Sequence, residues 1–229
     1  MYRKCFVVLI ISIAFLFVIT ISAEAALYDQ GDGTVLQVKD DLSQLLWLQD
    51  ASLAESETFG VTGINPANGT MDSWNTASNW IDALNTAEYA GYTDWRLPYT
   101  VQPDPSCGNQ NPDDQGWGPN CSASEMGSLH YDEFGGDVYN DSALPFTNFN
   151  STGYWSGTAY EPNPSAGYWW FSFGASYQNV GLATAPGGSV IAVRECPSCT
   201  VVPEPVSSTL FLVGGATLGF RRFRKRKTT

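Results

Sequence analysis

Basic residues are scarce in this 229-residue sequence, which holds 11 Lys and Arg against 23 Asp and Glu. The imbalance is sharpest between positions 26 and 200. There Lys39, Arg96 and Arg194 are the only basic residues against 21 acidic ones, a formal charge of −18. A body of that charge repels phosphate backbones and anionic lipid and attracts cations. We therefore expect no nucleic acid among its partners.

Histidine is nearly absent as well, since His130 is the only one in the chain. A Ser–His–Asp triad would have to use this residue, which lies between Leu129 and Tyr131, where packing is the commoner role. The sequence also has no glycine-rich phosphate-binding loop with a lysine. These absences leave few residues that could carry out nucleophilic catalysis or phosphoryl transfer, so we do not expect an enzyme.

Long apolar runs are also few, and the two longest lie at the ends of the chain. The first, at 6–21, follows Arg3 and Lys4 and precedes an A-x-A cleavage motif at 23–25. These are the three parts of a secretory signal peptide, so we expect residues 1–25 to be removed. An uncleaved membrane anchor is the alternative, but the run is short for a bilayer span of about 20 residues.

The second apolar run, at 206–220, follows the motif Pro203-Glu204-Pro205 and precedes six of the eleven basic residues, at 221–227. This order resembles the PEP-CTERM sorting signal of Gram-negative bacteria that make exopolysaccharide. The resemblance implies that residues 201–229 are a sorting tail with a short transmembrane helix over 206–220. It also implies an exosortase-type processing enzyme that acts near the Pro-Glu-Pro motif.

The basic end of this tail fixes the expected topology. Clusters of Lys and Arg stay on the cytoplasmic side of a membrane, so the body would lie on the other side of the inner membrane. We therefore expect an exported protein, anchored at least transiently in the inner membrane and then placed in the cell envelope or extracellular matrix. A plain single-pass tail anchor would put the body on the same side.

Four of the five cysteines lie between the two ends, and an even number in an exported protein indicates disulfides. Three pairings are open, and we favour Cys107–Cys121 and Cys196–Cys199. The first pair brackets a segment rich in Pro, Gly, Asn and Asp that has little apolar surface to pack and gains order from a crosslink. The second pair could instead be a redox motif or half a zinc site, but no second CxxC accompanies it.

Strand patterns dominate the body. Residues 28–50 predict a β-hairpin with strands at 34–39 and 43–48, because polar and apolar residues alternate on either side of a turn. Further strands are expected in segments dense in aromatic or β-branched residues, at 154–160, 168–173 and 190–194. Long irregular segments separate them.

Two short helices complete the pattern. Asp72 or Ser73 can cap a helix that runs to about Asn85 with apolar residues at helical spacing. Ser122 and Glu125 have the spacing of a capping box that opens a second, shorter helix. Residues 26–200 therefore predict one α+β domain with a mostly antiparallel sheet, two short helices and long loops.

The body also resembles the DUF1566 (Lcl C-terminal) domain family. Blocks in that family's order are Gly33-Thr34-Val35, Leu45-Leu46-Trp47, Trp80 with Leu84-Asn85, the GYTDWRLP run at 91–98, Tyr154-Trp155-Ser156 and Val193-Arg194. The resemblance covers about 28–196 and implies a C-type-lectin-like fold, shared with formylglycine-generating enzymes. In the family, Arg-Leu-Pro runs directly into a Glu-x-x-x-Leu helix. In this chain Glu125 and Leu129 match that helix, but an insertion at 100–123 intervenes and could alter or create a binding surface.

Arg96 and Arg194 stand out as isolated cations in an acidic, aromatic context. Such residues usually pair with a partly buried carboxylate, so we expect a structural role for both. The candidate partners are Asp94, Glu125, Asp132 and Glu195. An anchor for a ligand carboxylate or sulfate is the alternative.

Aromatic side chains supply the candidate ligand-binding residues, which are Trp117, Trp155, Tyr160, Trp169 and Trp170. Trp169 and Trp170 must point to opposite faces if they lie on a strand, so one of them packs in the core. Exposed aromatic rings can stack on the apolar faces of sugars or anchor protein partners. The alternative is that loops cover both faces of the sheet.

Acidic loops supply a candidate metal site. Asp132, Asp137 and Asp141 lie close in the sequence around two glycines, and Ca²⁺ takes six to eight oxygen ligands from such loops. The spacing does not match an EF-hand, and solvated acidic loops are the ordinary alternative. Calcium is the one cofactor that the sequence leaves open.

These features together predict an exported cell-envelope or extracellular-matrix protein with a lectin-like recognition domain. Its expected ligand is a glycan, an exopolysaccharide or a surface protein. One alternative is an enzyme of the formylglycine-generating class, although no cysteine motif of that activity is matched. The other is a structural matrix component without a defined ligand.

Overall fold

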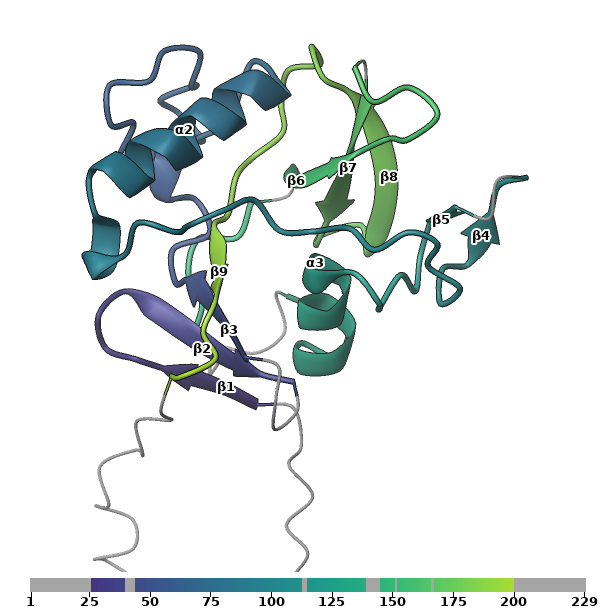
Figure 1. Ribbon diagram of the computed structural model, residues 1–229, viewed down its shortest axis with the longest axis horizontal. Coiled ribbons are helices and arrows are strands. Elements are labelled where there is room, and N and C mark those ends of the chain that lie inside the picture. Colours follow the sequence, from purple (N-terminus) through teal and green to yellow (C-terminus); the bar gives the residue numbers. More distant parts are fainter. Residues whose placement is uncertain are drawn as a thin grey trace, which may run out of the picture.

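The computed structural model describes residues 26–39, 44–112, 115–138, 145–150, 152–165 and 167–199 (Figure 1). They form an α+β body with two larger antiparallel sheets, one small two-stranded sheet, short helices and long loops, which confirms the predicted fold class. The arrangement is compatible with a C-type-lectin-like architecture. The predicted leader at 1–25 and the tail with Pro203, Glu204 and Pro205 lie outside the described residues. Within the described ranges, no helix has the length and hydrophobicity needed to cross a membrane.

The first sheet has four strands in the order β1-β2-β3-β9, all antiparallel. They are β1 (Ala26–Asp29), β2 (Thr34–Val38), β3 (Gln44–Leu48) and β9 (Val193–Glu195). The predicted hairpin is therefore confirmed as β2 and β3. Ala26 pairs with Val38, Val38 pairs with Gln44, and the amide of Cys196 donates to the Gln44 carbonyl. Both ends of the body therefore leave from the same end of this sheet, on its two outer strands.

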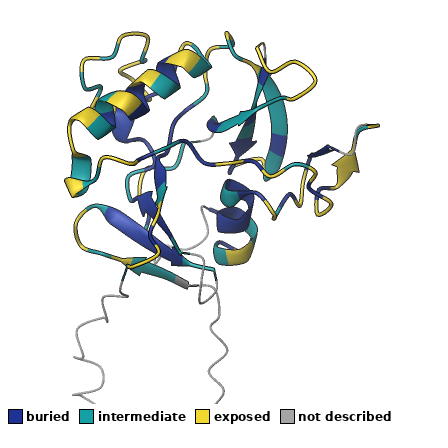
Figure 2. Cartoon of the chain, viewed as in Figure 1, coloured by how far each residue is buried: buried dark blue, intermediate teal, exposed yellow. Residues whose placement is uncertain are grey.

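Helix α2 (Trp74–Thr86) forms as predicted from its cap and its apolar spacing. The Ser73 hydroxyl accepts a hydrogen bond from the Thr76 amide at 3.3 Å, which satisfies one of the free amides at the helix start. The buried side chains of Trp80 and Leu84 lie one turn apart, so the helix covers the core with a single face. Figure 2 shows the exposed residues on the other face of this helix.

The second helix differs from the prediction at its start. It comprises α3 (Glu125–Ser128) and a π-helical turn, η3 (Leu129–Glu133), and it is preceded by Ser124, which makes no side-chain cap. The Ser122–Glu125 capping box was wrong because both residues bond elsewhere. The Ser122 amide donates a hydrogen bond to the Ser106 hydroxyl. The Glu125 carboxylate accepts hydrogen bonds from both terminal nitrogens of Arg96.

The second sheet has three antiparallel strands, β6 (Gly153–Ala159), β7 (Gly167–Ser172) and β8 (Tyr177–Leu182). The first two were predicted within about one residue. The sequence did not indicate β8, because its run Tyr-Gln-Asn-Val-Gly-Leu has no apolar face of period two. The predicted strand at 190–194 is regular only from Val193 onward. The preceding residues instead form a buried extended segment between the two sheets.

Smaller elements complete the chain. A short hairpin of two-residue strands, β4 (Asn109–Gln110) and β5 (Gly116–Trp117), projects beside β8 (Figure 1). Single 3-10 turns, η1 (Leu53–Glu55) and η2 (Tyr89–Gly91), flank α2 in the sequence. An aromatic cluster fills the space between η3 and the second sheet, and its rings are those of Phe134, Phe146, Phe149, Tyr154, Phe171 and Phe173.

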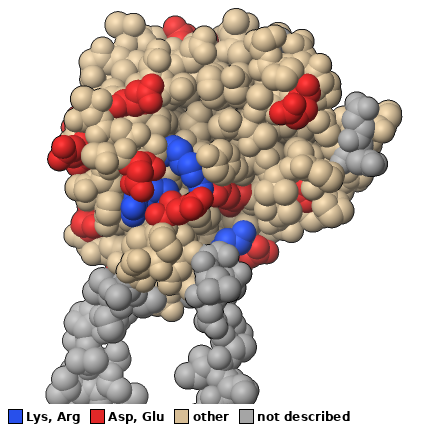
Figure 3. Space-filling model, viewed as in Figure 1, with Lys and Arg blue, Asp and Glu red and all other residues tan. Residues whose placement is uncertain are grey.

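The two arginines have the structural role expected of them. Arg96 forms a bidentate salt bridge with Glu125, with nitrogen–oxygen distances of 2.7 and 2.8 Å. Its guanidinium carbon also lies 4.1 Å from the centre of the Tyr99 ring. Arg194 forms a second bidentate salt bridge, with Asp94, and its guanidinium group lies over the Tyr92 ring. In Figure 3 the basic side chains on the visible face lie among acidic ones.

His130 also packs, as expected, rather than joining a catalytic triad. Its ring is fully buried against Phe171 and Phe173, and Nε2 lies 2.8 Å from the Ser176 hydroxyl. Nδ1 has no hydrogen-bond partner among the described residues, so no carboxylate in these ranges orients the ring. Burial lowers the pKa of His130 from 6.5 to about 4, against the opposing effect of Asp137.

The burial of the two ion pairs predicts unequal losses of stability. In the Arg96 pair the side chains of Arg96 and Glu125 are 19% and 15% exposed, whereas Asp94 is 58% exposed. Arg96→Met leaves a mostly buried carboxylate unpaired and should lower the free energy of unfolding by roughly 2 kcal/mol or more. Arg194→Met should lower it by less than about 1 kcal/mol. Urea denaturation with the disulfides intact measures both, and equal losses would contradict this assignment.

The depressed pKa of His130 predicts a specific dependence on pH. The folded state holds the His130 ring neutral, whereas the unfolded chain takes up a proton below about pH 6.5. The contribution of His130 to the free energy of unfolding is therefore complete above pH 6.5 and is lost as the pH falls toward 4. Between pH 7 and pH 4, the wild type should lose roughly 3 kcal/mol more of its unfolding free energy than His130→Gln. Chemical denaturation at several pH values tests this, and parallel curves for the two proteins would refute it.

Candidate functional site

The outward face of the β6–β7–β8 sheet carries two of the five aromatic residues singled out in the sequence, Trp155 and Trp170. Along β7 the side chains alternate as expected, with Trp169 and Phe171 buried in the interior and Tyr168 and Trp170 half-buried on the other face. Tyr168 stacks on Trp74 of α2 at 3.6 Å between ring centres. This stack covers one end of the outward face, and Trp170 lies beyond it.

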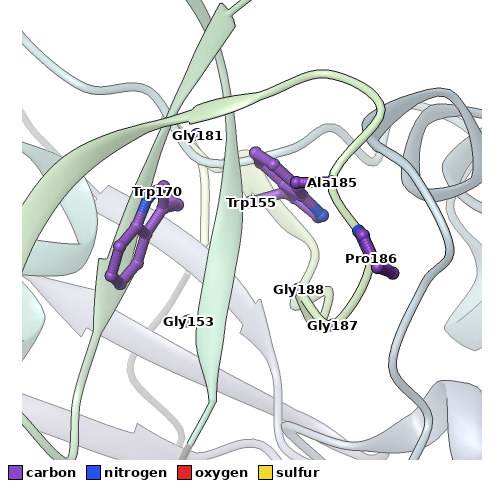
Figure 4. Close-up of a pocket in the computed structure, with 8 residues that line it drawn as sticks. All are labelled: Gly153, Trp155, Trp170, Gly181, Ala185, Pro186, Gly187 and Gly188. Atoms are coloured by element: carbon purple, nitrogen blue, oxygen red, sulfur yellow. The ribbon is translucent and has the colours of Figure 1, made fainter.

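Trp155 and Trp170 are paired directly across β6 and β7, so both indoles lie on this outward face. Between them and the segment at 185–188 is a hollow of about 190 Å³, which we call the tryptophan groove (Figure 4). Its walls are Gly153, Trp155, Trp170, Gly181, Ala185, Pro186, Gly187 and Gly188. None of these residues is ionisable, so the groove is electrically neutral within an acidic body.

Three glycines make room for the two indoles. A methyl group at Gly153 would lie 2.3 Å from Trp170 Cε3, and one at Gly188 would lie 2.2 Å from Trp155 Nε1. At Gly181 the contact with Trp155 Cη2 would be 3.0 Å. The first two distances are too short for a real side chain, so the groove depends on glycine at positions 153 and 188. At Gly181 a side chain would fit only if Trp155 shifted by a few tenths of an ångström.

Trp155 has a second unusual property. Its side chain is only 3% exposed, yet its indole nitrogen has no hydrogen-bond partner in the described part of the chain. In Figure 4 this nitrogen points to the side of Pro186. A buried donor without an acceptor costs about 1–3 kcal/mol, so this wall of the groove holds unused hydrogen-bonding capacity.

A second hollow of about 290 Å³ adjoins the groove, because Pro186 and Gly187 line both. Its other lining residues are Gly63, Asn65, Thr70, Met71 and Asp72, of which only Asp72 is ionisable. The Asp72 carboxylate accepts hydrogen bonds from the Thr76 and Ser73 hydroxyls, which lower the pKa of this group. The second hollow therefore presents a negative charge next to the neutral groove.

The other predicted ligand-binding residues are dispersed. Trp117 lies on β5, is 36% exposed and meets Tyr177 edge to face. Tyr160 is half-buried and packs against Trp169 at 6.0 Å. Trp169 is only 2% exposed and points from β7 into the interior, and its role as a contact residue stays a prediction.

Both favoured disulfides are present. Cys107–Cys121 closes the insertion, and Cys196–Cys199 follows the last strand at the edge where the chain leaves the sheet. The second pair therefore forms a clip at the end of the body, and in this state its sulfurs cannot serve as thiolate ligands to zinc.

The predicted calcium site is not assembled from the described residues. Asp132 accepts a hydrogen bond from the Ser128 hydroxyl at 2.9 Å, and Asp141 lies outside the described ranges. The only group of three metal-ligating side chains found in the described ranges is Asp104 with Cys107 and Cys121. Those two sulfurs are joined to each other, so the group cannot supply thiolate ligands. Calcium binding at Asp132 and Asp137 stays a prediction.

The groove itself was not foreseen. Trp155 and Trp170 were both candidates, but nothing in the sequence indicated that they would be cross-strand partners. The glycines at 153, 181 and 188 and Pro186 were missed entirely. The available signal was the unusual density of glycine between 181 and 188, which is typical of a close backbone approach.

Comparison with known proteins adds one finding. Residues 36–102 match the family model described as the Lcl C-terminal domain, a range that runs from β2 through α2 to the start of the insertion. No curated protein and no solved structure matched the chain. The matched domain and the two disulfides are consistent with an extracellular or cell-envelope protein.

Proposed function

We propose that this protein is a recognition domain of the cell envelope or extracellular matrix that binds a neutral glycan, such as an exopolysaccharide, in the tryptophan groove. The observation that carries the proposal is the pairing of Trp155 and Trp170 over a glycine floor without any ionisable group. An indole face stacks on the apolar face of a sugar ring, and such sites need little charge.

The negative charge of the body restricts the class of ligand that it can bind. With 21 acidic residues against three basic ones between positions 26 and 200, acidic polymers, nucleic acid and anionic lipid are repelled. The ionised Asp72 beside the groove adds to this repulsion locally. Both arginines are already paired with carboxylates, so neither is free to anchor an anionic group. These features favour an uncharged polysaccharide.

The arrangement of the chain ends supports display at a surface. Ala26 and Cys196 lie at the same end of the four-stranded sheet, whereas the groove lies on the three-stranded sheet. Figure 1 shows that the two sheets are separate. If an exosortase-type enzyme processes the tail as the sequence implies, the anchor in the inner membrane would attach at that end. The groove would then remain free to meet an extracellular ligand.

The alternative of a formylglycine-generating enzyme has less support. That class works through a cysteine pair, and all four cysteines of the body are joined in disulfides. His130 is buried away from the groove among phenylalanine rings. We therefore propose binding without catalysis.

Removing the main stacking surface should abolish most of the binding. Trp170→Ala should weaken affinity for neutral polysaccharides about tenfold or more, equivalent to about 1.4 kcal/mol, because the indole face is lost. Tyr99→Ala is the matched control, since this exposed ring belongs to no described ring–ring contact and lies away from the groove. A glycan array followed by calorimetry measures both. Absence of binding by the wild type, or equal binding by Trp170→Ala, would refute the proposal.

Export predicts a defined covalent form of the mature protein. Mass spectrometry of native material should find a chain that begins at Ala26 and contains no free thiol among the four remaining cysteines. Cell fractionation should recover it outside the cytoplasm. A cytosolic protein with its leader retained and its cysteines reduced would overturn the assignment.

A further inference from the structure

We propose that the insertion at 100–123 extends the tryptophan groove into a row of three aromatic rings that binds a polysaccharide chain over several sugar units. This inference rests on the proposed function and specifies its ligand as a polymer rather than a single sugar. The row consists of Trp170 on β7, Tyr177 on β8 and Trp117 on β5 of the insertion.

The three rings follow one another at nearly equal spacing. The ring centres of Trp170 and Tyr177 are 6.5 Å apart, and those of Tyr177 and Trp117 are 6.2 Å apart. Trp170 pairs with Asn179 and Tyr177 pairs with Ser172, which makes the two rings diagonal neighbours on the same face of the sheet. The row therefore begins in the groove and runs along the outward face to the insertion.

The backbone of the insertion is fixed to the sheet on either side of Trp117. Gly118 and Gln178 exchange two backbone hydrogen bonds at 2.8 and 2.9 Å, which adds the insertion to the edge of β8. The buried Gln178 side chain also donates to the Gly116 carbonyl at 3.2 Å. The Trp117 ring is thus held in place through its two neighbours while more than a third of it stays exposed.

The base of the insertion is equally constrained. Gln102 makes two hydrogen bonds with Gly116, at 2.8 and 2.9 Å, and the Cys107–Cys121 disulfide closes the segment. A methyl group at Gly116 would lie 2.1 Å from the Asp104 carbonyl, so two parts of the insertion approach so closely here that only glycine fits. A ring that is ordered before binding loses less entropy when it meets its ligand.

The chemistry of the row indicates its occupant. All three side chains are uncharged aromatics in a body with a formal charge of −18, which disfavours a polyanion. Evenly spaced rings suit a ligand that repeats along its length, and the apolar faces of neutral sugar units provide such a repeat. We therefore assign the row to a neutral polysaccharide chain and not to a protein segment.

A length series of neutral oligosaccharides tests the inference. Partial hydrolysates of the polysaccharides that bind on the array, from disaccharide to octasaccharide, are titrated by calorimetry against the full mature protein. Wild-type affinity should rise with length until the row is covered. Trp117→Ala should match the wild type for the shortest ligands and bind the longest about tenfold more weakly. Tyr99→Ala should match the wild type throughout.

The outcomes separate the two proposals. If the wild type gains affinity with length but Trp117→Ala gains equally, or if affinity does not depend on length, the row is overturned while the groove stands. If the wild type binds no glycan and captures only protein, both proposals fail. Trp117→Leu provides a second variant that keeps apolar area without a stacking face and should behave like Trp117→Ala. Thermal unfolding and intact disulfides verify that the variants are folded.

Discussion

The fold depends on one buried backbone segment that bonds to both sheets. The Ser189 amide donates to the Gly153 carbonyl and its carbonyl accepts from Trp155, which ties the segment to β6. Three residues later the Ala192 carbonyl accepts from Leu48 of β3, and Val193 exchanges two hydrogen bonds with Arg96. Because the side chains from Val190 to Val193 are buried, these bonds are shielded from water. The two sheets and the Arg96–Glu125 pair are thereby held in a single arrangement.

The groove is a direct product of that segment. Gly188 comes immediately before it and bonds to Met71, which places the chain against the indole of Trp155. The wall of the groove is therefore continuous with the core, and its geometry is as rigid as the packing beneath it. By contrast, the far end of the aromatic row belongs to an insertion that touches the sheet at its edge strand. The sequence of the insertion at 100–123 can therefore change without a change in the tryptophan groove or in the core beneath it.

Local features of the sequence predicted local structure well. The β2–β3 hairpin and α2 follow from alternation, helical spacing and a serine cap, all of which operate within a few residues. Long-range partners overrode the local pattern elsewhere. Glu125 has the spacing of a capping box but pairs with Arg96, 29 residues away. Strand β8 has little hydrophobic periodicity, because Gln178 faces the insertion and Gly181 leaves space for Trp155 and Trp170. Alternation showed that Trp169 and Trp170 face opposite ways, but only the tertiary fold determines which of them is buried.

The position of the two chain ends has a consequence beyond membrane attachment. Ala26 and Cys196 lie on the same row of a four-stranded sheet, which places them roughly 15 Å apart at the usual spacing between strands. A body whose ends emerge side by side is a portable module: it can be spliced into a loop of an unrelated host, or repeated in tandem, without distortion of its core. If the groove binds a polysaccharide as proposed, several copies along one chain would bind a long polymer with greater avidity than a single copy.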